Sequence, residues 1–209
     1  MQKLIQSISE YGPYLASVVK YENEAVLNKE IVEGSETFTF SDVIEFKKVK
    51  FKYETGSKET FSDLSFSIRQ GEMVGIIGPS GVGKTTIVDL ILRFFRPTGG
   101  EITIDGKNIS TIKLRNWRSQ IGYISQDIFL LNDTIANNIR FYDDTLSDKD
   151  LERAASLANI SEFIDSTPNK FETVIGERGV MLSGGQRQRI IIARILARSP
   201  RILILDEAT

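Results

Sequence analysis

The sequence predicts an α/β protein in which short apolar strands alternate with helices. Residues 73–77 and 202–205 are uninterrupted apolar runs, typical of strands buried on both faces of a parallel sheet. A segment with helical spacing of apolar residues follows the first run at 85–95 and precedes the second at 185–197. This alternation predicts a mostly parallel sheet, with a β-rich start and a helical insertion.

The composition is that of an ordinary globular protein and excludes several kinds of site. Of the 209 residues 41% are hydrophobic and 26% charged, and the net charge is -2, so nucleic acid is not an expected partner. The absence of cysteine excludes disulfides and thiolate metal sites. Because histidine is also absent, proton transfer would fall to carboxylates, lysine or tyrosine.

The first 43 residues form a separate segment. Their apolar residues recur at helical spacing and predict one or two amphipathic helices, interrupted or kinked at Gly12-Pro13, with a linker at 33–36. No run approaches the roughly 18 to 20 apolar residues that span a bilayer, and the start lacks the apolar core of a signal peptide. We therefore expect a soluble, cytoplasmic piece.

The remaining elements follow in order. Strands are predicted at 44–53 and 61–68, a hairpin at 101–108 around Asp105-Gly106, and a strand at 121–125. Residues 133–165 are predicted to be mainly helical, with Ser147 and Ser161 as caps.

A glycine-rich loop lies between the first apolar run and the helix after it. Its residues fit the pattern G-x-x-x-x-G-K-T/S: Gly78, Pro79, Ser80, Gly81, Val82, Gly83, Lys84 and Thr85, with Thr86 next in the chain. Glycines allow successive N–H groups to wrap a phosphate, and the helix adds the positive end of its dipole. Lys84 would reach the β- and γ-phosphates and Thr85 would bind Mg²⁺. The alternative, a plain turn beside a lysine, leaves this placement unexplained.

Asp206 and Glu207 follow the second apolar run directly. Ligands of parallel sheets bind beyond the carboxyl ends of the strands, so both carboxylates are expected on the same rim as the phosphate loop. Asp206 could hold Mg²⁺, and Glu207 could accept a proton from the water that attacks the γ-phosphate. The alternative is a solvated turn or a helix cap.

Ser183-Gly184-Gly185 begins a helix and forms a second potential anion site. A simple N-cap at Ser183 is the alternative. With the neighbouring residues it reads Leu-Ser-Gly-Gly-Gln, and this segment resembles the signature of the nucleotide-binding domain of ATP-binding-cassette proteins.

The resemblance covers about residues 44–209 and includes the loop at 78–85 and the pair at 206–207 in the same order. It implies a P-loop NTPase core with an antiparallel β subdomain and a helical subdomain, with ATP and Mg²⁺ as cofactors. It also implies that two such domains pair head to tail, so that Ser183 and Gly185 contact the γ-phosphate of the nucleotide held by the partner.

Further positions match the family. Tyr53 corresponds to the aromatic residue that stacks on adenine, with a core aromatic as the alternative. Gln126 corresponds to the glutamine that touches Mg²⁺ and couples the site to the membrane domain, with a solvated loop residue as the alternative. Residues 176–179 and 132–139 are similar to segments of exporters.

The resemblance implies the ATP-hydrolysing motor domain of an exporter, on the cytoplasmic face of a membrane and joined through residues 1–43 to a membrane-spanning domain. Family members continue beyond this sequence with a strand that bears a histidine, so we expect an incomplete C-terminal part and poor hydrolysis by this piece alone. Two other readings remain open: a soluble cassette ATPase that acts on DNA or ribosomes, and a module that binds nucleotide without turnover. The N-terminal helix could also pack on its own domain. The transported substrate is not indicated.

Overall fold

The computed structural model describes residues 2–27, 34–54, 56–125, 127 and 129–206. The chain divides into two compact units, Met1–Glu33 and Gly34–Thr209. Each unit is described by itself.

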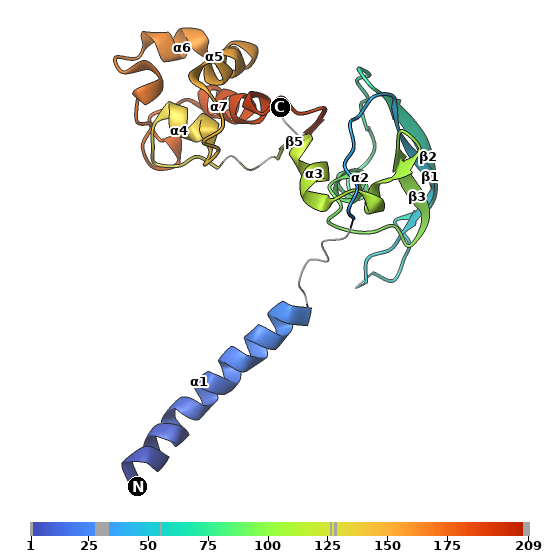
Figure 1. Ribbon diagram of the computed structural model, residues 1–209, viewed down its shortest axis with the longest axis vertical. Helices are drawn as coiled ribbons and strands as arrows, with labels where there is room; N and C mark the ends of the chain where they lie inside the picture. Colours follow the sequence, from blue (N-terminus) through green and yellow to red (C-terminus); the bar gives the residue numbers. More distant parts are fainter. Residues whose placement is uncertain (1, 28–33, 55, 126, 128, 207–209) are drawn as a thin grey trace. The chain divides into compact units, whose positions relative to one another are not determined.

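The first unit is the helix α1 (Gln2–Leu27), which continues through Pro13 instead of breaking there (Figure 1). The hydroxyl of Ser17 donates a hydrogen bond of 2.9 Å to the carbonyl of Pro13, one turn earlier. The sequence predicted one or two helices, interrupted or kinked at Gly12-Pro13, and of these forms the interruption is wrong: α1 is one helix with Pro13 inside it, because a long helix can retain its other hydrogen bonds when proline removes one. In the described part of the chain, no helix combines the length and the hydropathy needed to cross a membrane.

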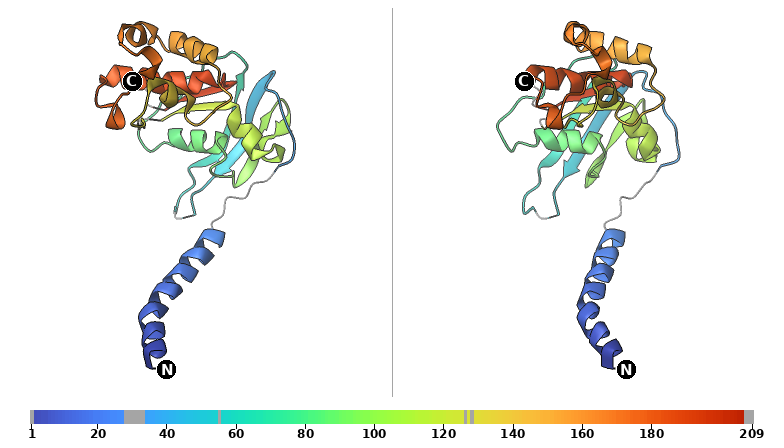
Figure 2. Two further views of the ribbon diagram at one scale, coloured as in Figure 1. Left: turned by 60° about the vertical axis from the view of Figure 1, so that its left-hand side comes forward. Right: turned by 90° about the vertical axis from the view of Figure 1, so that its left-hand side faces the viewer.

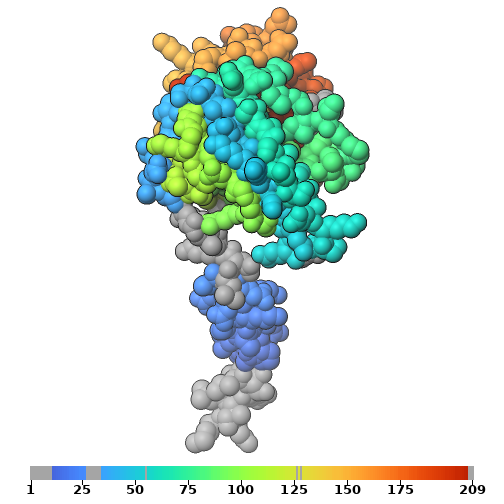
Figure 3. Space-filling view, turned by 90° about the vertical axis from the view of Figure 1, so that its right-hand side faces the viewer, coloured from blue at the N-terminus to red at the C-terminus, as the bar shows by residue number. Residues whose placement is uncertain are grey.

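The second unit begins with a four-stranded antiparallel sheet in the order β2-β1-β3-β4. Its strands are β1 (Val43–Phe51), β2 (Phe61–Arg69), β3 (Gly99–Ile104) and β4 (Lys107–Asn108). The predicted hairpin is confirmed: Asp105 and Gly106 join β3 to β4 with φ angles of 48° and 77°, the left-handed values that a tight two-residue turn requires. Figure 3 views this sheet from the side away from α2 and shows its strands next to one another.

Two helices pack on one face of this sheet and share a hydrophobic core with it (Figure 2). They are α2 (Lys84–Ile91), which begins at the phosphate loop, and α3 (Leu114–Ser119), which follows the short 3-10 helix η1 (Ile109–Thr111). Trp117 of α3 is fully buried, and its indole N–H donates a 2.6 Å hydrogen bond to the carbonyl of Ile91 at the end of α2. The core of this half is therefore continuous from the sheet through α2 to α3.

A helical region encloses a second core. It consists of α4 (Ile135–Arg140), α5 (Asp148–Leu157), α6 (Ser161–Ser166) and α7 (Gly184–Ala197), with the short 3-10 helices η2 (Lys170–Glu172) and η3 (Glu177–Gly179). Ser147 caps α5 as predicted, in a reciprocal capping box with Asp150. The predicted cap at Ser161 is wrong. Asn159 adopts a left-handed φ of 55°, and the N–H of Ile160 bonds back to Ala155, which places buried Ile160 at the cap position.

Strands β5 (Ile121–Ile124) and β6 (Ile202–Leu205) pair in parallel. They form a sheet of two strands among the described residues, so the predicted mostly parallel sheet is limited to this pair. The prediction that β6 is buried on both faces is wrong, since Leu203 and Leu205 are 46% and 58% exposed.

Residues 73–77 do not form the predicted buried strand. They lie outside the regular elements, and Met73 and Ile77 are 98% and 94% exposed. A strand needs a neighbour for its N–H and C=O groups. In the described part of the chain β6 pairs with β5, and no strand pairs with residues 73–77. Apolar composition alone therefore predicted a strand for which the described residues supply no pairing partner.

Candidate functional site

The phosphate loop, residues 78–85, leads directly into α2. Gly81 and Gly83 have φ angles of 78° and 102°, and Gly83 is the N-cap of the helix. A Cβ on Gly83 would lie 2.6 Å from the ring of Phe61 and 2.9 Å from the methyl group of Thr60. Glycine is required at this position for its backbone angle and for the close approach of β2.

Lys84 spans this loop from the first turn of α2. Its Nζ donates hydrogen bonds of 2.9 Å to the carbonyl of Gly78 and 3.0 Å to that of Pro79. The ammonium group is thereby held against the start of the loop, beside the N-terminus of α2. A phosphate group wrapped by the loop would meet both this cation and the helix dipole.

Tyr53 and Thr86, two candidate nucleotide-binding residues, contact each other. Their hydroxyl groups lie 2.8 Å apart, and Thr86 is 5% exposed, whereas Thr85 is exposed. The ring of Tyr53 makes edge contacts with Phe51 at 4.8 Å and Phe95 at 5.2 Å. The aromatic group predicted to stack on adenine is thus anchored to the helix that begins at the phosphate loop, and the stacking itself stays a prediction.

Asp206 follows β6 at the edge where both parallel strands end. Its backbone N–H bonds to Ile124 at 3.0 Å, and its carboxylate accepts a 3.2 Å hydrogen bond from the hydroxyl of Tyr123 on β5. Burial raises the pKa of Tyr123, and the negative charge of Asp206 raises it further.

A second carboxylate, Asp89 on α2, lies within electrostatic reach of this group. Burial raises the pKa of Asp89, and the charge of Asp206 adds to the rise. A common rim for Asp206 and the phosphate loop stays a prediction. The sequence interpretation missed Tyr123 and Asp89. The i,i+4 spacing of Thr85 and Asp89 could have indicated that Asp89 shares a helix face with the end of the loop.

The oxygen ligands available here fit a magnesium ion that is held mainly by a nucleotide. Thr85 offers an exposed hydroxyl and Asp206 a carboxylate. Among the described residues no group of three or more His, Cys, Asp or Glu side chains could hold a metal ion. Mg²⁺ commonly binds through one or two protein oxygens, substrate phosphates and water, which is the set this edge can provide.

The second potential anion site lies at the start of α7. Ser183 is the N-cap: its hydroxyl accepts a 3.3 Å bond from the N–H of Gln186, and its own N–H donates to the Gln186 side chain at 2.8 Å. Ser183, Gly184 and Gly185 are exposed. In Figure 1 α7 lies among α4 to α6, whereas α2 lies against the antiparallel sheet, so the two sites are carried by different regions. Gln126 and Glu207, the other candidates, lie outside the described residues.

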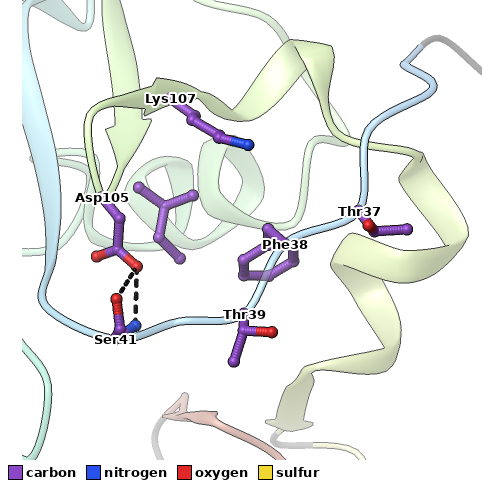
Figure 4. A pocket seen from close by; sticks show the side chains of 7 residues that line it. Thr37, Phe38, Thr39, Ser41, Asp105 and Lys107 are labelled. Carbon is purple, nitrogen blue, oxygen red and sulfur yellow. Dashed lines mark hydrogen bonds between the residues drawn. The ribbon is translucent and has the colours of Figure 1, made fainter.

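A separate pocket of about 370 Å³ lies between residues 37–41 and the β3–β4 hairpin (Figure 4). Asp105 occupies one wall and accepts hydrogen bonds of 2.8 to 2.9 Å from the N–H groups of Ser41, Asp42 and Val43 and from the Ser41 hydroxyl. Partial burial raises the pKa of Asp105, but these hydrogen bonds outweigh it and hold the pKa below its ordinary value. The hydrogen bonds of the Asp105 carboxylate therefore hold the start of β1 against the β3–β4 hairpin.

Replacing Asp105 by asparagine should lower the free energy of unfolding by about 1 kcal/mol at pH 7, a small value because the carboxylate is partly exposed. Because the pKa of Asp105 is lower in the folded state than in the unfolded state, its carboxylate stabilises the protein at pH values above the unfolded-state pKa. This stabilisation is lost as the pH falls through the folded-state pKa. The difference between wild type and Asp105→Asn should therefore shrink below about pH 4. Urea unfolding at several pH values measures this difference in the free energy of unfolding, with Asp42→Asn as the neighbouring control. A constant difference from pH 7 to pH 3 would contradict the assignment.

Comparisons with known proteins identify the family. A family model described as "ABC transporter" matches residues 61–209, more than half of the chain. The chain is 44% identical over 187 residues to the Xenopus tropicalis protein named "ATP-binding cassette sub-family B member 6", an alignment that covers 90% of this chain and 22% of the relative. It is 47% identical over 167 residues to the Vibrio vulnificus "ATP-dependent lipid A-core flippase", covering 79% and 29%.

A solved structure supports the same assignment. The structure described as "a bacterial Atm1-family ABC exporter with ATP bound" is similar with a TM-score of 0.79 and 37% identity, over 92% of this chain and 34% of that chain. The chain spans less than a third of the length of the curated relatives named above. Its α/β architecture matches the nucleotide-binding domain of an ABC exporter. Together with the phosphate loop, the edge at Asp206 and the Ser-Gly-Gly start of α7, these matches show that the chain belongs to the ABC transporter family.

Proposed function

We propose that this chain is the ATP-hydrolysing motor domain of an exporter, in which MgATP binding and hydrolysis at residues 78–85 drive transport through a membrane-spanning domain. The observation that carries the proposal is the geometry around α2. The loop presents the Lys84 ammonium at the N-terminus of this helix, where its Nζ donates hydrogen bonds to the carbonyls of Gly78 and Pro79. The membership of the ABC transporter family supports the same reading.

Each candidate residue has a role in this proposal. The loop N–H groups and Lys84 bind the phosphates, while Thr85, Asp206 and Gln126 hold the magnesium ion. Bound magnesium supplies Lewis-acid stabilisation of the negative charge on the phosphate oxygens. Glu207, directly after Asp206 in the chain, accepts a proton from the attacking water.

The start of α7 serves a second copy of the domain in this proposal. Two nucleotide-binding domains pair head to tail, and Ser183 and Gly185 of one contact the γ-phosphate bound by the other. Support comes from the exposure of both residues and from the different regions that carry α7 and the phosphate loop. The paired domains would lie at the cytoplasmic face of a membrane.

The replacement Glu207→Gln tests the proposed function in the full-length protein. ATP binding should remain within about twofold of wild type, while turnover should fall by about 10²- to 10³-fold, because the proton acceptor is lost but the phosphate contacts are kept. Phosphate release and binding of a fluorescent ATP analogue measure the two effects. Glu152→Gln, at an exposed position of α5, is the control. Turnover near the wild-type rate in Glu207→Gln would remove Glu207 as the base, and a wild-type protein without ATP turnover would refute the function.

A further inference from the structure

A buried arginine joins α7 to the chain that follows β5. Arg194 lies on α7 and is 7% exposed. Its guanidinium donates to the carbonyl of Asn138 at 2.7 Å and, through a second nitrogen, to the carbonyl of Phe129 at 2.9 Å. The fork of one side chain therefore bridges two points of the chain that are nine residues apart, one in the loop after β5 and one in α4.

Asn138 extends this bridge to a third point. Its side chain is fully buried, and its Oδ1 accepts hydrogen bonds from the N–H of Leu131 at 2.9 Å and from Arg194 at 3.3 Å. Its Nδ2 donates to the carbonyls of Leu131 at 3.1 Å and Thr134 at 2.9 Å. All four hydrogen-bonding positions of the amide are thus used, and the backbone at Leu131 is held on both its N–H and its C=O sides.

Within the described part of the chain, the charge of Arg194 is held without a carboxylate. Among the described residues its partners are carbonyl and amide oxygens and the ring of Phe141, whose centroid lies 4.2 Å from the guanidinium carbon. Burial, with a contribution from the positive charge of Arg198, lowers the pKa of Arg194 to about 10, so the side chain remains protonated at neutral pH. Taking a cation out of water without an opposite charge is costly, and an apolar side chain could fill the same volume. Its hydrogen bonds therefore indicate a requirement for defined geometry at this place.

The elements joined by the Arg194–Asn138 network adjoin two candidate sites, the edge at Asp206 and the start of α7 at Ser183. The loop begins where β5 ends beside Asp206, since Ile124 pairs with Leu205 and accepts the N–H of Asp206. Helix α7, which Ser183 caps, also packs closely on β5, where Gly122 faces Ile195 without room for a Cβ. The Arg194–Asn138 network thus holds residues 129–131 to α7, and the same helix packs on β5, the strand beside Asp206.

We propose that Arg194 and Asn138 are positioning residues for ATP turnover, which hold the loop at 129–131 against α7 and so fix the Asp206 edge relative to the Ser183 end of that helix. The inference rests on the proposed function. Neither side chain touches the phosphate loop, so their loss should affect the geometry of turnover and leave the binding of ATP intact.

The test uses the full-length protein with Arg194→Met and Arg194→Lys. Both variants should lower kcat per bound nucleotide about tenfold, with KM for ATP changed less than about twofold, because the reacting groups are misplaced while the phosphate contacts remain. Lysine should not rescue the rate, since one ammonium cannot bridge the carbonyls of Phe129 and Asn138 as the planar fork does. Deuterium uptake at residues 129–131 should be faster in both variants.

Arg198→Met is the matched control. Arg198 lies one turn after Arg194, and its hydrogen bonds go to Asp143 and to the carbonyls of Arg140 and Phe141 instead of to residues 129–131. It should change neither the kcat nor the uptake at 129–131. If Arg194→Met does not fold, Arg194→Lys carries the test, since it retains the charge.

The outcomes separate this inference from the proposed function. An active wild type whose Arg194 variants keep the wild-type kcat would overturn the positioning role, and so would full rescue by lysine. Equal losses in Arg198→Met would show a general effect of disturbing α7 and would also overturn it. A wild type without turnover would instead refute the proposed function.

Discussion

Lys84→Ala is expected to reduce ATP turnover by about 10²- to 10³-fold, the range found when one preorganised donor to developing charge is removed. The Nζ of Lys84 lies 2.9 and 3.0 Å from the carbonyls of Gly78 and Pro79, so the cation is held against the start of the loop. Alanine leaves the loop N–H groups and the helix dipole in place, but it removes the charge that would lie against the β- and γ-phosphates. Affinity for ATP should fall as well.

The measurement combines the steady-state phosphate release of the full-length protein with titration of a fluorescent ATP analogue. Lys149→Ala, an exposed lysine on α5, controls for the loss of one positive charge and should behave as wild type. Lys84→Arg tests whether charge alone is sufficient. Its planar, bulkier head does not reproduce a point charge between two carbonyls, so it should recover little activity. Turnover within tenfold of wild type in Lys84→Ala would contradict the proposed role.

The features that sequence predicted well in this region are local in the chain. The helix that follows the glycine-rich loop, the cap of α5 at Ser147 and the turn at Asp105-Gly106 each depend on a few consecutive residues whose backbone angles or hydrogen bonds the residue types determine. The partners of Asp206 could not be found in this way. The hydrogen bond from Tyr123 depends on the register of β5 against β6, and the influence of Asp89 depends on where α2 packs.

The predictions that failed depend on strand pairing or on burial, which the residue types of the segment itself do not determine. Residues 73–77 have the composition of a buried strand, but a strand forms only where another strand supplies its hydrogen bonds. Ser161 is a good capping residue, yet the buried side chain of Ile160 and the left-handed Asn159 decide where α6 begins. The network around Arg194 could not be predicted either, because an arginine on an amphipathic helix is normally exposed.

Trp117→Ala is expected to cause the largest loss of stability, about 3–5 kcal/mol in the free energy of unfolding. The side chain is fully buried, its ring lies 5.1 Å from that of Phe38, and its N–H bonds to the carbonyl of Ile91. Alanine would leave a large cavity and an unpaired buried carbonyl at the end of α2. Because α2 begins at Lys84, the loss should also weaken the packing that orients the phosphate loop.

The measurement is urea unfolding of the 209-residue chain. Trp117 is its only tryptophan, so the transition must be followed by circular dichroism and not by tryptophan fluorescence. Trp117→Phe retains an aromatic ring but no N–H, and should lose about 1–3 kcal/mol, which separates the hydrogen bond from the volume. Phe95→Ala is the comparison on a partly exposed aromatic in the same half and should cost less than Trp117→Ala. Equal losses in Trp117→Ala and Phe95→Ala would show that Trp117 is not the centre of this core.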